Sequence, residues 1–321
     1  MIPGLWKRIP FLSFNHSTLF SGQNLNGQSP TRNNVMSMAR FMIPRNILFL
    51  FFSVTILIIF YSAISRLIIL SFNNELYSHM VLIPLISGYF VYSKRKTIFA
   101  NKKYSFAAGT ILTIAGIIFY LLGINQQIKL NQNDYLFITV SSALISWTGG
   151  LIFFYGTKTF RNALFPLLFL VFMVPIPTYV VDKIVFFLQV GTAEVASIFF
   201  KLIGITVFRE GLIFQLSNVS IEVAKECSGI RSSMATVIIG VILEQMFLRS
   251  WWRKAVLLLS IIPLIIIKNG IRVTVLTLLG NYVDSKFLTH SWLHKGGGIV
   301  FFMPIIIMLI GILWLLKRSE T

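Results

Sequence analysis

The feature that most constrains this chain is a succession of long apolar segments, from about residue 46 to residue 316, separated by short polar loops. A hydrocarbon core about 30 Å thick is crossed by a helix of about 20 residues, and the chain offers that length several times. With 56% hydrophobic and 12% charged residues, it carries more apolar side chain than one soluble core of this length encloses. The sequence therefore predicts an all-α polytopic integral membrane protein.

We expect seven to eight transmembrane helices. The apolar segments that predict them are 46–70, 80–93, 105–124, 136–156, 162–181, 230–248, 255–280 and a last one that ends at Lys317. Residues 182–204 also have a helical pattern, but polar side chains interrupt it, so this stretch could lie in the interface or re-enter instead of crossing. Residues 206–224 alternate apolar and polar side chains around Ser217 and Asn218, which predicts a small extracytoplasmic β-hairpin.

Three parts follow from this pattern. Residues 1–45 are rich in Asn, Ser, Gly and Pro and are expected to be a mostly disordered cytoplasmic tail, with no cleavable signal peptide. Residues 46–181 form the N-terminal transmembrane helices. Residues 182–321 contain the interfacial helix, the hairpin and the transmembrane half that carries the candidate active site.

Basic clusters set the expected orientation of the chain. Residues 94–103 and 249–254 are rich in Lys and Arg, and such loops stay on the cytoplasmic side of a membrane. The start of segment 230–248 and the loop 281–295 then face outside. The same basic loops explain the net charge of +18 without nucleic acid, which we do not expect as a partner.

A single cysteine, Cys227, lies in the sequence EVAKECSGIRS at residues 222–232. One cysteine excludes an internal disulfide, and the spacing of Cys and His predicts no metal site; no cofactor is expected. Cys227 lies at the predicted N-terminus of segment 230–248, where the helix dipole favours a thiolate. Arg231, four residues later, is expected on the same helical face. The alternative is that Cys227 is a small apolar packing residue.

Two later sequences contain possible partners for the thiol. In KNGIRVT, Arg272 is eight residues from the predicted outer end of its helix, about 12 Å deep. A guanidinium at the bilayer centre costs roughly 2.5 to 3.5 kcal/mol, so it needs a partner or a water-filled cavity, unless it snorkels to the headgroups. Asn269 shares its face, and Lys268 has no assigned role. In WLHKGGGIVFF, His294 precedes the last apolar segment.

These three blocks resemble the exosortase/archaeosortase family. The family's pattern is a Cys-Ser-Gly-x-Arg block, then Asn-x-x-Arg, then His followed by glycine and an aromatic residue. The resemblance extends from about His79, in SHMVLIPLI, and includes the Pro-Ile-Pro sequence at 175–177 and Arg-Glu-Gly at 209–211. One departure is Glu226, where the family often has Ala, because an adjacent carboxylate raises the pKa of a thiol.

The resemblance implies a sortase-like cysteine transpeptidase at the outer face of the cell inner membrane. Such an enzyme cleaves the C-terminal sorting signal of a secreted protein, which consists of a short motif, a transmembrane helix and a basic tail, and passes the new C-terminus to an acceptor, here unknown. Cys227 would be the nucleophile, Arg272 the stabiliser of the oxyanion or substrate, and His294 the acid and base. The residues expected to bind substrate are Arg231, Asn269, His79 and Ser228.

Two alternatives remain open from the sequence. His290 is a near-equal candidate for the acid and base. The protein could also be a non-enzymatic transporter, or a protein of exopolysaccharide export or assembly, in which Arg272 lines a solute path. Cys227 discriminates between the classes, because a transporter does not need it.

Overall fold

The computed structural model of the chain describes residues 32–100, 103–125, 130–216, 219–225, 229–283 and 298–320. Two units are distinguished, residues 1–48 and 49–321, and the contacts below all lie within the second. Helix α1 (Arg32–Ile59) begins within the segment 1–45 that we expected to be mostly disordered.

Six described helices are long and apolar enough to cross a membrane. They are α5 (Phe106–Asn125), α6 (Gln132–Asn162), α8 (Thr178–Ile203), α9 (Ile230–Phe247), α10 (Trp251–Tyr282) and α13 (Gly298–Arg318). The C-terminal part of α1 and helix α2 (Tyr61–Asn73) bend by 71° at their junction and add a seventh if they form one broken span. The predicted fold class, an all-α polytopic membrane protein, is confirmed.

Two of the segments expected to span form shorter helices. Helix α3 (Leu82–Ser93) has 12 residues, about 18 Å at 1.5 Å per residue, which is less than a hydrocarbon core. The segment 162–181 contains the short helix α7 (Leu164–Phe169) and the 3-10 helix η2 (Leu170–Met173). The chain is then non-helical through 174–177, because prolines there lack the N–H that would continue the helix.

Residues 182–203 belong to one continuous helix, α8, of 26 residues. Two of the polar side chains that suggested an interfacial helix have partners in the structure. Gln189 donates to a backbone carbonyl 34 residues later, and Glu194 pairs with Arg209. Gln189 and Glu194 are thus paired within the protein. Helix α8 as a whole has the length and apolar composition of a membrane span.

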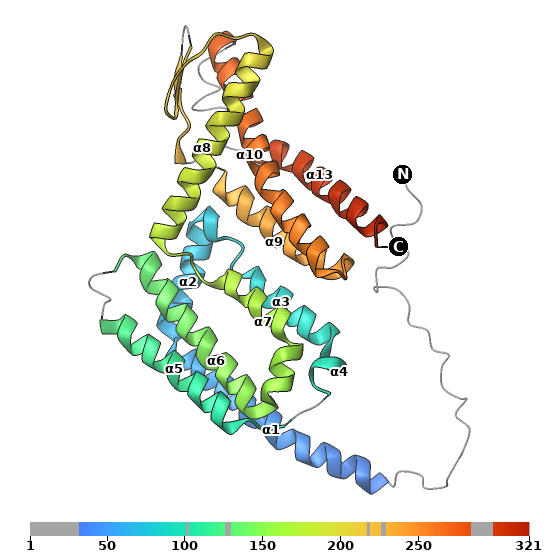
Figure 1. Cartoon of the computed structure of the whole chain (residues 1–321). Helices are drawn as coiled ribbons and strands as arrows, with labels where there is room; N and C mark the ends of the chain where they lie inside the picture. Colours follow the sequence, from blue (N-terminus) through green and yellow to red (C-terminus); the bar gives the residue numbers. More distant parts are fainter. Residues whose placement is uncertain are drawn as a thin grey trace. The chain divides into compact units, whose positions relative to one another are not determined.

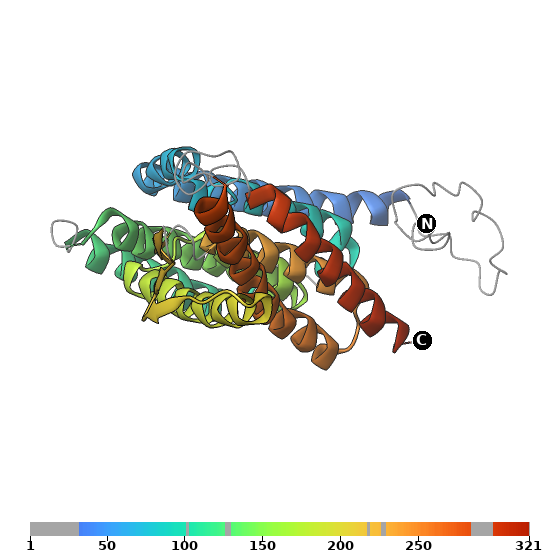
Figure 2. The same ribbon diagram turned by 90° about the horizontal axis from the view of Figure 1, so that it is seen from above.

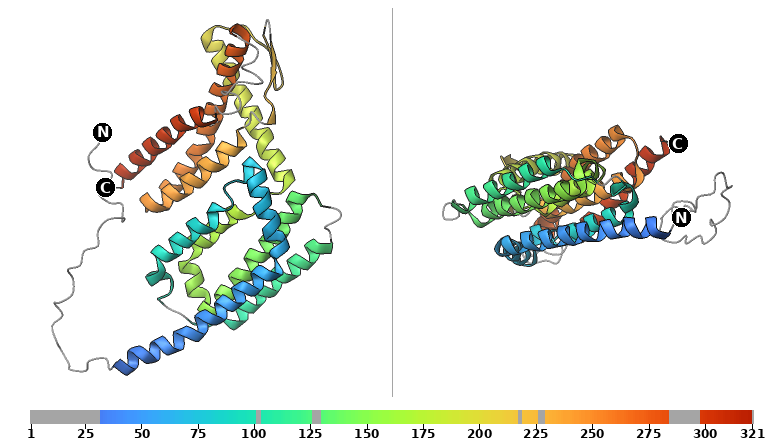
Figure 3. Two further views of the ribbon diagram at one scale, coloured as in Figure 1. Left: turned by 180° about the vertical axis from the view of Figure 1, so that it is seen from behind. Right: turned by 90° about the horizontal axis from the view of Figure 1, so that it is seen from below.

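Helices α5 and α6 form a close antiparallel pair, side by side in the views from the front and from above (Figures 1 and 2). A methyl group at Gly116 would lie 2.3 Å from Ser146 Oγ, and one at Gly149 would lie 2.5 Å from Thr113 Oγ1. Small residues allow such close backbone approach between membrane helices. Helix α3 lies beside α7 (Figure 3), and α4 (Arg95–Ile98) follows it.

Helix α10 is the centre of the C-terminal half, because it packs against α8, α9 and α13 (Figure 1). The buried core between them includes Leu188, Leu257, Ile261, Leu264, Ile265 and Leu309. Helix α9 also contacts the 3-10 helix η1 (Glu75–Tyr77), and its Ile238 joins the core formed by α3, α6 and α7. Through α9, the start of the C-terminal half is held against the N-terminal helices.

The end of α13 is tied to the beginning of α10. The carboxylate of Glu320 accepts hydrogen bonds from the backbone N–H groups of Arg249 and Ser250, at 3.0 and 2.9 Å, and Arg253 lies 3.3 Å from the same carboxylate. An anion at a helix N-terminus is favourable because the first N–H groups of the helix have no partner within it.

The expected hairpin is present as β2 (Ile213–Gln215) and β3 (Ser220–Glu222), but the sheet has three antiparallel strands. The additional strand, β1 (Phe208–Glu210), pairs with β2 through a two-residue turn. Gly211 begins this turn with a φ of 59°, a conformation that glycine adopts without steric cost. The sheet lies beside the C-terminal end of α8 (Figure 1), where Phe214 packs on Phe200 with ring centroids 5.4 Å apart.

Candidate active site

Four predicted site residues lie outside the described residues: Cys227, Ser228, His290 and His294. Their roles therefore remain predictions. The structure does describe the chain on both sides of Cys227, up to Lys225 and again from Gly229, together with the other predicted site residues Arg231, Asn269, Arg272 and His79.

The chain before Cys227 is anchored on α8. Gln189 Nε2 donates a hydrogen bond of 2.7 Å to the carbonyl of Val223, and Val223 is fully buried. Lys225 Nζ lies 3.1 Å from a carboxylate oxygen of Asp182, on the same helix. The buried hydrogen bond is the stronger tie, because the ion pair is exposed to solvent and such pairs contribute little.

The chain after Cys227 is anchored on α10 through Gly229. This residue has a φ of 66° and precedes the first turn of α9, where its carbonyl accepts from the hydroxyl and the backbone N–H of Ser233. A methyl group at Gly229 would lie 2.4 Å from Asn269 Oδ1. Asn269, whose side chain is fully buried, thus packs directly against the backbone of Gly229, so that only glycine fits.

Lys268 forms a second tie between α10 and α9. Its ammonium donates to the hydroxyl of Ser232, which in turn donates to the carbonyl of Gly229 at 2.9 Å. Lys268 is 6% exposed, so its charge is held near the first turn of α9. The sequence had given this lysine no role, although its spacing of one turn from Arg272 places both cations on one face of α10.

Arg272 lies three residues after Asn269 and is half-buried. Because α10 continues to Tyr282, the guanidinium is ten residues from that end, about 15 Å, somewhat deeper than expected. A positive helix N-terminus, a buried ammonium and a half-buried guanidinium on α9 and α10 together favour an anion, whether a thiolate or an oxyanion.

The expected shared helical face of Arg231 and Cys227 remains a prediction, because Cys227 lies outside the described residues. Helix α9 begins at Ile230, after the left-handed Gly229. Arg231 is exposed in the first turn of α9. The adjoining residues Gly229 and Ser232 are the ones that Asn269 and Lys268 of α10 contact.

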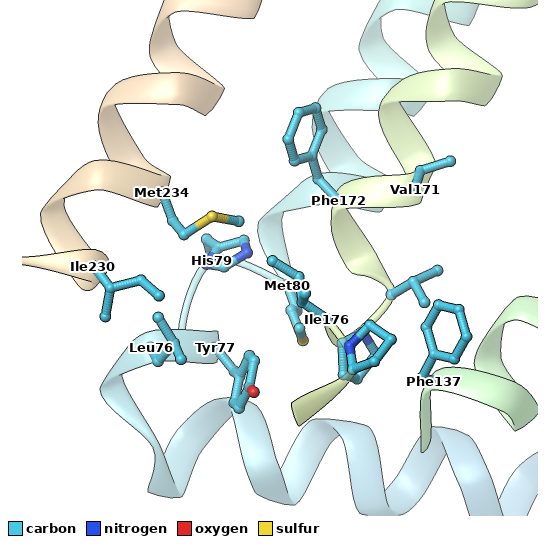
Figure 4. Close-up of a pocket in the computed structure, with 13 residues that line it drawn as sticks. Leu76, Tyr77, His79, Met80, Phe137, Val171, Phe172, Ile176, Ile230 and Met234 are labelled. Atoms are coloured by element: carbon cyan, nitrogen blue, oxygen red, sulfur yellow. The ribbon is translucent and has the colours of Figure 1, made fainter. Parts of the chain in front are cut away.

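An apolar pocket of about 310 Å³ lies against the first turns of α9 (Figure 4). Its walls come from α9, from the turn between η1 and α3, from η2 and from the Pro-Ile-Pro break. The lining includes Ile230, Met234, His79, Met80, Phe172 and Ile176. Segments that are far apart in the sequence thus meet at this pocket, beside the helix that begins three residues after Cys227.

The Pro-Ile-Pro wall of the pocket is fixed by the N-terminus of α6. Asn133 Nδ2 donates to the carbonyl of Ile176, and a carboxylate oxygen of Asp134 accepts from the N–H of Thr178 at 2.7 Å. Asp134 therefore caps the start of α8 from another helix. Asn131 caps α6 itself, accepting from the N–H of Asp134 at 2.8 Å.

His79 lines this pocket, and its imidazole lies near Met234 in Figure 4. Its Nε2 atom is buried and makes no hydrogen bond with the described residues. Burial lowers the pKa of His79, while hydrogen bonds with the backbone of Phe172 and Leu76 act in the opposite direction. The net effect lowers the pKa of His79 from the ordinary value of 6.5 and so favours the neutral imidazole.

The described residues contain no group of three or more His, Cys, Asp or Glu side chains that could hold a metal ion. The polar chemistry of this region comes from the cations, amides and hydroxyls on α9 and α10.

Residues 71–311 match the model of the family described as Transmembrane exosortase (Exosortase_EpsH). The chain belongs to this family. Searches of curated proteins and of solved structures gave no match. Exosortase membership supports a role as a membrane sorting enzyme, and the matched range includes the pocket, the sheet, α9 and α10.

Proposed function

We propose that this exosortase is a membrane-embedded cysteine transpeptidase, with its active site at the outer face of the inner membrane. It would cleave the C-terminal sorting signals of secreted proteins and transfer the new C-terminus to an acceptor. The observation that carries the proposal is the anchoring of both flanks of Cys227: Val223 on α8 and Gly229 on α10. A nucleophile needs such fixed geometry, because misplacement by about 1 Å can reduce the rate 100-fold.

The proposed reaction has two steps. The thiolate of Cys227 attacks the scissile carbonyl carbon, and the tetrahedral oxyanion is stabilised by Arg272 and by the positive end of α9. The C–N bond breaks as His294 gives its proton to the leaving amine, which leaves a thioester. An amine or hydroxyl of the acceptor, or water, then attacks the thioester carbonyl and loses its proton to the same imidazole, and the C–S bond breaks to release the Cys227 thiolate.

The pocket beside α9 is the proposed site for an apolar side chain near the scissile bond. Its walls are mainly Met, Phe, Pro and Ile, and its volume of about 310 Å³ is at the lower end of ligand pockets. His79 would contact this part of the substrate, whereas Asn269 would act as a positioning residue that holds Gly229.

Substrate processing in cells tests the nucleophile. In a strain with Cys227→Ser or Cys227→Ala, a co-expressed protein with a native sorting signal should remain uncut and membrane-held. The intact protein should yield a product shorter by roughly 20 residues of helix and the tail. Ser260→Ala is a control, because that hydroxyl donates within its own helix to Leu257. Equal cutting in the Cys227 strains would refute the nucleophile and favour the transporter or export-protein alternative.

Two further substitutions test the partners of Cys227. Arg272→Lys should be nearly as damaging as loss of the thiol, because lysine lacks the planar, forked set of donors. His294→Ala should reduce processing more than His290→Ala. The reverse order of the two histidines would assign the acid and base to His290.

The proposed orientation can be measured with cysteines introduced into the Cys227→Ser protein. A membrane-impermeant thiol reagent applied to intact cells should label a cysteine at Asp284 but not one at Lys96 or Trp252, which lie in the basic loops expected inside. Labelling at Lys96 or Trp252 and not at Asp284 would place the proposed site on the cytoplasmic side and would contradict the orientation.

A further inference from the structure

A second, larger cavity of about 740 Å³ lies in the N-terminal half. Its walls come from residues 53–99 of α1 to α4, from α6 and from η2, and it shares no lining residue with the pocket beside α9. Gly88 of α3 borders it, and a methyl group built on Gly88 would meet no atom within 4 Å. The cavity is therefore open space alongside α3, separate from the proposed active site.

One face of α3 lines this cavity along most of the helix. Pro84, Ser87, Gly88, Val91 and Tyr92 all belong to the lining, and their spacing of three and four residues places them on one stripe. From residue 84 to residue 92 the stripe is about 12 Å long. The cavity is thus elongated along α3, and the lining of the cavity continues beyond this helix to Arg95.

The polar groups in the wall are already engaged within the protein. Ser87 Oγ donates to the carbonyl of Pro166 at 2.8 Å, and Trp147 Nε1 donates to Ser53 Oγ at 3.0 Å. The remaining lining is aliphatic and aromatic apart from Arg95. A cavity with such walls does not hold ordered water, so its occupant is apolar over most of its length.

The size of the cavity argues against a transmembrane helix as the occupant. A helix about 10 Å wide with a pitch of 5.4 Å fills about 420 Å³ per turn, so 740 Å³ accommodates fewer than two turns. A span needs about 20 residues. A single flexible hydrocarbon chain fits the length and the width better.

The basic residues at one end of the cavity indicate which headgroup the apolar chain carries. Arg95 is exposed there; its guanidinium lies 4.1 Å from the centroid of the Tyr92 ring and donates to the Tyr92 carbonyl at 3.0 Å. Lys94 and Lys96 flank it, and both are exposed. Such basic groups near a membrane surface attract anionic headgroups. We propose that this cavity binds one acyl chain of an anionic phospholipid, whose phosphate lies against Arg95.

Tryptophan quenching tests this proposal on the full-length protein in nanodiscs. The protein retains Trp147 and has its other tryptophans replaced by phenylalanine, and the probes are phosphatidylglycerol and phosphatidylcholine with brominated acyl chains. We expect the anionic lipid to quench Trp147 at about five-fold lower mole fraction, which corresponds to about 1 kcal/mol for one basic residue. Equal quenching by the two lipids would refute the headgroup assignment.

Two variants locate the site. Gly88→Phe fills the cavity and should at least halve the quenching, whereas Gly311→Phe on α13, where a side chain also meets open space, should leave it unchanged. Arg95→Gln should remove the preference for the anionic lipid without closing the cavity. Unchanged quenching in a folded Gly88→Phe protein would refute the cavity as the site.

Native mass spectrometry identifies what the cavity retains after release from the nanodisc. One phosphatidylglycerol should remain on the intact protein, and it should be lost in Gly88→Phe. Retention of detergent alone, or displacement of the lipid by an apolar helical peptide, would refute a phospholipid as the occupant.

Discussion

Gly229→Ala should destabilise the protein far more than the same change at Gly204 or Gly211, two left-handed glycines where an added methyl group would meet open space. A left-handed conformation costs a residue with a Cβ roughly 1 to 2 kcal/mol. Gly204 has a φ of 78° and a methyl group there would meet no atom within 4 Å, so Gly204→Ala carries only this backbone cost. At Gly229 the methyl group would also lie 2.4 Å from Asn269 Oδ1, a buried atom. Overpacking of this kind adds typically 1 to 3 kcal/mol, for a total of about 2 to 5 kcal/mol.

A double-mutant cycle isolates that contact. Asn269→Ala removes the amide, so the double variant Gly229→Ala, Asn269→Ala should recover part of the loss, with a coupling free energy of about 1 to 3 kcal/mol. Thermal unfolding in nanodiscs, followed by tryptophan fluorescence, measures the four proteins. The reasoning is refuted if Gly229→Ala is no more destabilising than Gly204→Ala, or if the two changes at 229 and 269 are additive.

Two further predictions concern the ties that surround the site. Gln189→Leu leaves the buried Val223 carbonyl without its donor, so the free energy of unfolding should fall by about 1 to 3 kcal/mol and substrate processing should decrease. Asp182→Asn weakens an exposed ion pair and should lower the free energy of unfolding by less than about 1 kcal/mol. Thermal unfolding and processing assays on the two variants compare these effects. Hydrogen bonds from Ser250 and neighbouring groups lower the pKa of Glu320 below 4.5, so its stabilisation is present above that pH and is lost as the pH falls through the lowered pKa. Glu320→Gln should therefore lower the melting temperature at pH 7 but much less at pH 3, and an equal effect at both would contradict the assignment.

The long helices could be predicted because span length and apolar composition are local properties of the sequence. The segment 162–181 was misjudged in length, because apolar composition does not reveal that its helical part ends at Met173, before the Pro-Ile-Pro sequence. The strand β1 was missed because a Gly-Leu turn gives a weaker signal than the polar residues 217–218 between β2 and β3.

The site was predictable in its residue types but not in its contacts. The spacing placed Asn269 and Arg272 on one helical face, and the structure agrees. That the partner of Asn269 is the backbone of Gly229, and that Lys268 donates to Ser232, depends on how α9 packs on α10. Periodicity within one helix does not contain this information. The meeting of the His79 turn with the Pro-Ile-Pro break at α9 likewise joins segments about 100 residues apart.

The contact between Gly229 and Asn269 also restricts the order in which the sequence can change during evolution. A side chain at position 229 is tolerated only after the residue at 269 has become smaller, and a smaller residue at 269 alone leaves a gap against the backbone of α9. The two positions, forty residues apart, should therefore be inherited as a pair. Gly116 of α5 differs, because a methyl group there would also lie 2.7 Å from the backbone nitrogen of Ser146, so no smaller side chain at position 146 would make room for it.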